Sequence, residues 1–238
     1  MSSVIGQSYI DPRGDLLDKN RNPTTGEPYL DIIEITLVSS GSEYVGTIKL
    51  DGDVPSKTAD PSIFIEWDFM LDTDKNPNTS PWGRAPLLVN DIGVDYMVRL
   101  CLLGDDRWGE IYDGLKNSFY GIDSYVADNQ IKLTFSPEDI RGSTCFDFVV
   151  LVRKYGNKGA PDALLIFDKA PGEGHFRFEE GSVTYIPRVS ALPNLPNFLI
   201  LVGVVAVIPV IAIVIVALLK RKPKSNNNPR DNPQVSCK

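Results

Sequence analysis

The sequence predicts an all-β protein: an antiparallel β-sandwich, followed by one C-terminal transmembrane helix. Short runs of alternating apolar and polar residues recur at regular spacing, with Gly, Pro and Asp between them. No long amphipathic helix or heptad run interrupts them. Residues 198–219 then form an uncharged run of roughly 22 residues, enough to cross a bilayer as a helix. The predicted parts are an extracellular sandwich domain (1–186), a Pro-rich stalk (187–197), a membrane helix (198–219) and a basic tail (220–238).

Each predicted strand follows from its own pattern. Residues 31–38 and 43–50 are expected to form a hairpin around residues 39–42. Residues 63–71 alternate strictly, which places Trp67 on the core face. Ser136 before Pro137, followed by acidic residues, predicts a short helical turn over 136–140. Further strands are expected at 95–103, 108–113, 118–122, 130–135, 144–153, 164–167 and 175–178.

The membrane helix also predicts an orientation. Four cations follow it directly (Lys220, Arg221, Lys222 and Lys224), so the positive-inside rule places the tail in the cytoplasm and the domain outside the cell. We therefore expect a single-pass cell-membrane protein that contacts lipid through Phe198 to Leu219. The first residues carry no apolar signal segment. Either a signal lies upstream, which we favour, or the protein is tail-anchored with a cytosolic domain.

The charge and composition of the predicted domain argue against several classes of function. The chain has 24 basic and 31 acidic residues. The tail holds six basic residues and one acidic residue, so 18 basic and 30 acidic residues precede it. Such an acidic domain does not suit nucleic acid. A single histidine, His175, and the absence of a GxSxG motif remove common hydrolase chemistries. A glycosidase-like carboxylate pair stays possible, but a non-enzymatic role is favoured.

Two cysteines lie in predicted strands, on the faces opposite the core. Cys101 shares its face with Arg99, and Cys145 shares its face with Asp147. If the two strands were neighbours, the thiols could form a cross-strand disulfide. The alternative is two free thiols.

Two acidic segments are candidate calcium sites. Asp72, Asp74 and Asn76 alternate after a strand, and calcium takes six to eight oxygen ligands that such spacing can supply. No EF-hand glycine or distant glutamate accompanies them. The alternative is that these residues cap turns by bonding nearby backbone amides. The second acidic segment contains Asp11, Asp15 and Asp31.

A family resemblance rests on four motifs: D-P-x-G-D, P-Y-L-D-I, W-x-F-x-L-D-T-D-x-N-P-x-T and G-V-D-Y-M-V-R-L. Over residues 9–155 they resemble prokaryotic cell-surface sandwich domains, the DOMON-like group and family nine carbohydrate-binding modules. The resemblance implies a jelly-roll sandwich, in several members with structural calcium, that binds sugar or haem or serves as a surface module. It implies that Asp11, Asp15 and Asp31 meet near the first strand. Haem is not expected, because His175 lies in a loop-like segment and Met70 and Met97 lie in strands. No nucleotide is expected, because no glycine-rich phosphate loop is present.

Exposed aromatic rings are the residues that sugar binding needs. Trp82, Trp108 and Tyr112 are the candidate ligand-binding residues, and Phe119, Tyr120 and Tyr125 are further possibilities. The alternative is that these rings pack in the ordinary way. We therefore expect a module that binds carbohydrate or another surface component, or else a structural or interaction subunit of a surface assembly without a small-molecule ligand.

Overall fold

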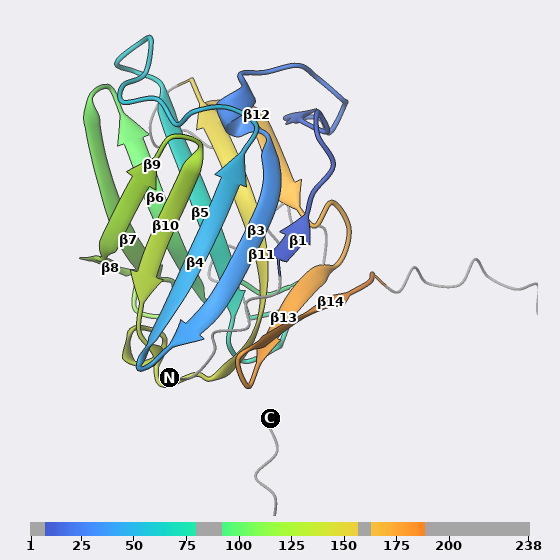
Figure 1. Cartoon of the computed structure of the whole chain (residues 1–238), viewed down its shortest axis with the longest axis vertical. Helices are drawn as coiled ribbons and strands as arrows, with labels where there is room; N and C mark the ends of the chain where they lie inside the picture. The colour runs from blue at the N-terminus through green and yellow to red at the C-terminus, as the bar shows by residue number, and fades with distance from the viewer. Residues whose placement is uncertain (1–7, 80–91, 157–162, 189–238) are drawn as a thin grey trace, which may run out of the picture. The chain divides into compact units, whose positions relative to one another are not determined.

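The part of the chain that the computed structural model describes consists of two antiparallel β-sheets that face each other (Figure 1). The structure describes residues 8–79, 92–156 and 163–188. The helices in these ranges are two 3-10 turns, η1 (Pro28–Leu30) and η2 (Pro137–Ile140), and neither could cross a membrane. The predicted membrane helix and basic tail, and Trp82, lie outside the described residues. The prediction of an all-β, antiparallel fold is confirmed.

The smaller sheet has five strands. The predicted hairpin is confirmed, with Ser40 paired to Glu43 across a turn at Gly41, whose φ of 66° suits glycine. In spatial order, the strands are β1 (Ser8–Ile10), β3 (Ile32–Ser40), β4 (Glu43–Leu50), β10 (Gln130–Phe135) and β9 (Asp123–Ala127).

The larger sheet has nine strands and is centred on β11, which is bordered by β5 along one edge and by β12 and β13 along the other. The small strand β2 (Leu17–Asp18) pairs with β12 (Leu164–Ala170). The remaining order is β14 (Ser182–Ile186), β13 (His175–Glu179), β11 (Cys145–Tyr155), β5 (Phe64–Asp72), β6 (Tyr96–Leu103), β7 (Asp106–Asp113) and β8 (Ser118–Gly121).

The main core lies between the sheets. Trp67, Phe69 and Phe148 project into it and are almost completely buried, as the alternation in residues 63–71 predicts for Trp67. Gly46 of β4 faces the Phe69 ring, and an added Cβ would lie 2.7 Å from it. A side chain at position 46 would therefore push the sheets apart, because protein interiors are close-packed.

Much of the outer face of the larger sheet, over β5 and β11, is also buried, which alternation alone does not predict. A second apolar cluster there includes Met70, Met97 and Val149. Cys101 and Cys145 are buried free thiols, and β5 separates their strands, so the disulfide hypothesis is wrong. Burial raises the pKa of the Cys101 thiol, which keeps it protonated.

Every strand predicted from sequence is present, with ends shifted by a few residues. The helical turn is also confirmed, since the Ser136 backbone N–H donates to Asp139 Oδ2 at 2.7 Å. The strands that sequence reasoning missed are the short or edge strands β1, β2, β9 and β14. They carry too few alternating residues to produce a pattern.

Candidate functional site

An acidic cluster joins the N-terminal segment to strand β12. Asp11, Asp15 and Asp168 each place a carboxylate oxygen within 4.8 Å of the others. Asp11 follows β1 and is held by its own backbone N–H, which donates to the Ile33 carbonyl at 3.1 Å. In Figure 1 the segment after β1 runs to the end of the sandwich where β12 lies. The cluster therefore links the two sheets at one end, and we call it the N-terminal cluster.

Buried carboxylate oxygens in this cluster lack hydrogen-bond donors. Asp11 is only 2% exposed, and within the described residues neither of its carboxylate oxygens has a hydrogen-bond partner. The same holds for Asp15 Oδ1 and for Oδ1 of the nearby Asp31. Buried polar atoms are almost always satisfied, so several unsatisfied oxygens in one place need an explanation. A bound cation supplies one.

The remaining oxygens of the cluster are held in place by backbone amides. Asp168 Oδ2 accepts from the Ile32 N–H at 2.7 Å, and its Oδ1 accepts from the Lys169 N–H at 2.7 Å. Asp31 Oδ2 accepts from the Gly14 N–H at 2.8 Å. These bonds orient the two carboxylates before any ligand arrives.

The pKa values of two carboxyl groups in the N-terminal cluster lie far above the ordinary value of an aspartate. Burial, followed by the charges of Asp168, Asp15 and Asp31, raises the pKa of Asp11 to about 9, although Lys169 opposes this rise. Burial also raises the pKa of Asp168 to about 7, and the charge of Asp15 adds to it, although the Ile32 amide opposes the rise. Carboxylates with these neighbours take up either protons or a cation. Oxygen-only donors of this kind suit a hard divalent ion such as calcium.

A second acidic group forms in the loop that follows β5. Asp72, Asp74 and Asp95 bring carboxylate oxygens within 4.8 Å of one another. We call this the β5-loop cluster. It includes two of the three residues that the sequence predicts as calcium ligands, and Asp95 replaces Asn76. Asn76 Oδ1 instead accepts from the Asn78 N–H at 3.1 Å.

Backbone and hydroxyl donors satisfy most of the β5-loop cluster. Asp72 accepts from the N–H groups of Asn76 at 3.2 Å and Gly93 at 2.9 Å. Asp95 Oδ2 accepts from the Thr73 N–H at 2.9 Å and the Thr73 hydroxyl at 2.7 Å. Only Asp95 Oδ1 is buried without a partner among the described residues. This pattern is typical of carboxylates that shape a turn.

Two metal-site candidates were therefore missed by sequence reasoning, Asp95 and Asp168. Asp95 stands in the quoted G-V-D-Y motif at the start of a strand, and that position could have drawn attention to it. Asp168 ends an apolar run, LLIFD, and carries no comparable signal. Pairing of β12 with β2 and β11 brings it to the cluster.

Trp108 and Tyr112, two of the three predicted ligand-binding residues, lie on the outer face of the larger sheet. Trp108 is half-buried, lies 6.3 Å from the Phe64 ring and donates its indole N–H to Glu110 Oε2 at 2.9 Å. Tyr112 is 6% exposed, and its hydroxyl donates to Asn117 Oδ1 at 2.8 Å. Phe119, 57% exposed, is the more open ring of this face and lies 4.6 Å from Tyr112.

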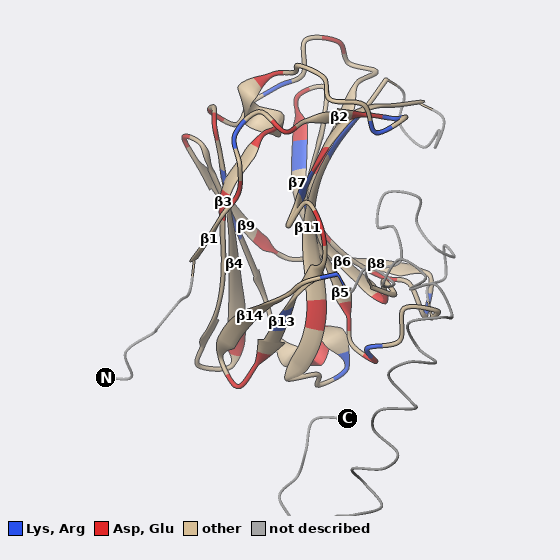
Figure 2. Cartoon of the chain, turned by 90° about the vertical axis from the view of Figure 1, so that its right-hand side faces the viewer, with Lys and Arg blue, Asp and Glu red and all other residues tan. Residues whose placement is uncertain are grey.

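The same face carries a buried ion network. Arg99 pairs with Glu66 at 2.8 Å and with Glu110 at 2.6 Å. Arg153 pairs with Glu66 at 2.7 Å and with Asp68 at 2.8 Å. Figure 2, which views the sheets edge-on, shows red and blue bands along the strands of the larger sheet. Each of the two cations meets two carboxylates, with Glu66 shared between them, so the network connects four adjacent strands.

Comparison with known proteins identifies no relative of this chain. No family model matches the chain, and no match was found among curated proteins or among solved structures.

Proposed function

We propose that this chain is a membrane-anchored, non-enzymatic surface module. Its jelly-roll-like sandwich is stabilised by calcium and binds carbohydrate or another component of the cell surface. The observation that carries the proposal is Asp11, a buried carboxylate with two unsatisfied oxygens beside Asp15 and Asp168.

Calcium in the N-terminal cluster would have a structural effect. It would cancel the repulsion among Asp11, Asp15 and Asp168, with Asp31 adjacent. Because Asp168 lies in the larger sheet and Asp11 follows β1 of the smaller sheet, the ion would fasten the two sheets at one end. Such a site stiffens the scaffold and leaves the faces of the sandwich free for recognition.

The outer face of the larger sheet supports a binding role. Trp108 and the exposed Phe119 lie beside the Arg99 network, and Arg99 lies 5.6 Å from the Phe119 ring. Aromatic rings next to fixed charged groups are the surface that sugar recognition uses, since rings stack on sugar faces and charged groups accept or donate hydrogen bonds.

Calcium is expected to stabilise the full chain through the N-terminal cluster. At calcium concentrations a hundred times Kd, the free energy of unfolding should rise by about 2.7 kcal/mol. The measurement is thermal melting in excess calcium and in chelator. Asp11→Asn/Asp15→Asn should abolish the difference. It should also raise the melting temperature in chelator, because a neutral amide replaces the Asp11 carboxyl, which the metal-free fold must protonate.

Asp72→Asn/Asp74→Asn is the matched control, since it removes the same charge from the β5-loop cluster. It should leave the calcium response intact. If this variant alone loses the response, the ion binds in the β5 loop instead. Equal melting temperatures with and without calcium in the unsubstituted chain would refute the cation proposal altogether.

The calcium response should also depend on pH. The folded-state pKa of Asp11, about 9, lies above its ordinary value of about 4, so metal-free stability falls as pH rises through this window. Calcium must displace these protons to bind. The shift in melting temperature should therefore be small at pH 5 and should grow towards pH 8.

Membrane topology is tested separately. Protease added to intact cells should remove the domain and leave the segment after residue 220 protected, because the cations that follow the membrane helix hold it inside. An epitope tag at the N-terminus detects the domain after protease treatment, and a second tag at the C-terminus detects the tail. A domain that survives in sealed cells and is cut only after lysis would support the tail-anchored alternative.

A further inference from the structure

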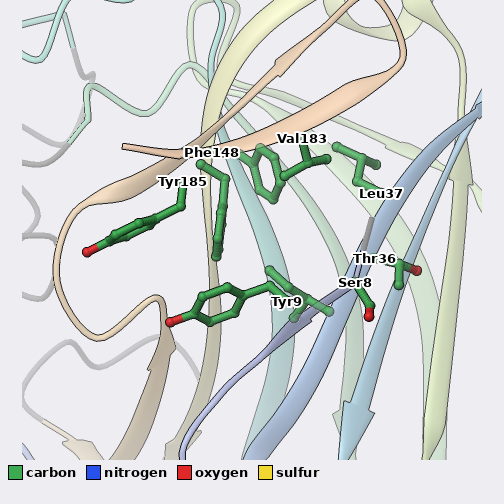
Figure 3. Close-up of a pocket in the computed structure, with 9 residues that line it drawn as sticks. Ser8, Tyr9, Thr36, Leu37, Phe148, Val183 and Tyr185 are labelled. Atoms are coloured by element: carbon green, nitrogen blue, oxygen red, sulfur yellow. The ribbon is translucent and has the colours of Figure 1, made fainter. Parts of the chain in front are cut away.

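A cavity opens between the two sheets at one edge of the sandwich. It lies where β1 and β3 of the smaller sheet meet β13 and β14 of the larger sheet, with a contribution from β11 (Figure 3). Its volume is about 320 Å³. This falls in the range of cavities that hold small molecules. Tyr185 at the rim is 44% exposed, so solvent reaches the opening.

The floor of the cavity is apolar and rigid. Leu37, Phe148 and Phe176 line it, and each is 1% exposed. The rings of Phe148 and Phe176 lie 5.2 Å apart. These side chains belong to the main core, so their positions are set by packing before any ligand binds.

Two tyrosines form the wall towards solvent. The rings of Tyr9 and Tyr185 lie 6.3 Å apart at 27°, and Tyr9 meets Phe176 edge-on at 4.7 Å. The Tyr185 hydroxyl donates to the Glu173 carbonyl at 3.1 Å, which fixes this ring. Figure 3 shows both tyrosines projecting from their strands at the same side of the cavity.

The polar side chains that line the cavity, among the described residues, are all neutral. They are the hydroxyl groups of Ser8, Thr36, Tyr9 and Tyr185, and no Asp, Glu, Lys or Arg of the described ranges joins them. A charged ligand would lose its hydration here without gaining an opposite charge, which is costly.

We infer that this cavity is a binding site for a small, uncharged molecule that combines an apolar ring with a hydroxyl group. The ring would pack on Phe148, Phe176 and Leu37, and the hydroxyl would face the rim. A sugar ring fits less well, because its several hydroxyls would meet an apolar floor and lose their hydrogen bonds. The inference goes beyond the proposed function and does not depend on the cation.

Titration with phenol tests the inference. The full chain, with ¹³C-labelled Ile, Leu and Val methyl groups, is placed in lipid nanodiscs and followed by NMR. Phenol should shift the methyl signals of Ile35, Leu37 and Val183 in a saturable way. The expected Kd is about 1 mM, since a ligand of this size gains little total free energy. Methyl glucoside at the same concentrations should leave these signals unmoved.

Two variants make the result specific. Val183→Phe places a ring in the cavity and should weaken phenol binding at least about tenfold. Tyr185→Ala removes an exposed wall and should weaken binding while the other methyl signals keep their folded positions. Val126→Phe is the matched control, since Val126 is a half-buried valine on β9, at the opposite end of the smaller sheet from β1.

The outcomes are distinct. Shifts confined to the three cavity methyl groups, weakened by Val183→Phe and retained in Val126→Phe, support the inference. Unmoved cavity methyl groups at saturating phenol would overturn it, and so would shifts that Val183→Phe leaves unchanged. Saturable binding of methyl glucoside in place of phenol would also overturn it, because the ligand class would then be wrong.

Discussion

Replacing Trp67 with alanine is expected to lower the free energy of unfolding by about 3–5 kcal/mol. Trp67 is fully buried between the sheets, so the change leaves a large cavity. Its indole N–H also donates to the Tyr29 carbonyl at 3.1 Å, which fastens η1 to the larger sheet. The alanine variant also loses this hydrogen bond, which is a further cost. Chemical denaturation of the full chain measures the loss.

Two controls separate these contributions. Trp108→Ala removes the same side chain from a half-buried position and should cost clearly less. Trp67→Phe keeps most of the packing but loses the hydrogen bond. Its loss of unfolding free energy should therefore fall between those of Trp108→Ala and Trp67→Ala. A loss below about 1 kcal/mol for Trp67→Ala would show that the ring does not support the core.

Arg153→Met is expected to cost about 3–5 kcal/mol, because it leaves a buried carboxylate without its cation. Arg153 bonds Asp68 Oδ2 at 2.8 Å and Glu66 Oε1 at 2.7 Å. Glu66 would keep Arg99 at 2.8 Å and the Tyr155 hydroxyl at 3.0 Å. Asp68 is completely buried and would keep no ion pair among the described residues. Denaturant titration again measures the effect.

A double variant supplies the internal check. In Arg153→Met/Asp68→Asn both charges of the pair are gone, so stability should recover by a substantial part of the single-variant loss. A single-variant loss below about 1 kcal/mol would show that water screens the pair as it does at a surface. In that case the network would contribute little to holding β5, β6 and β11 together.

Prediction from sequence works best where the determining interactions are local. Alternation in residues 63–71 places Trp67 in the core, and the same period marks β4, β6 and β11. The cap of η2 is equally local, since Ser136 and Asp139 lie within one turn. Edge strands such as β1 and β14 were missed because three to five residues carry little periodic signal.

The acidic clusters show why spacing is a weaker guide to chemistry. Asp72, Asp74 and Asn76 have the spacing of cation ligands, yet local backbone donors satisfy most of their oxygens. Asp11 and Asp15 have a less regular pattern, yet both oxygens of Asp11 and Oδ1 of Asp15 are buried without donors among the described residues. Whether a carboxylate oxygen has a hydrogen-bond donor therefore depends on which backbone segments pack against its cluster.

The sequence by itself determined the fold class, most of the strands and the residues of the main core, because side-chain alternation is a property of consecutive residues. Tertiary structure alone decided that Asp168 joins Asp11 and Asp15, that Cys101 and Cys145 stay apart, and that much of the outer face of the larger sheet, over β5 and β11, is buried. The pKa and hydrogen bonding of a side chain depend on groups within a few ångströms of it. Here strand pairing between distant segments brings those groups together.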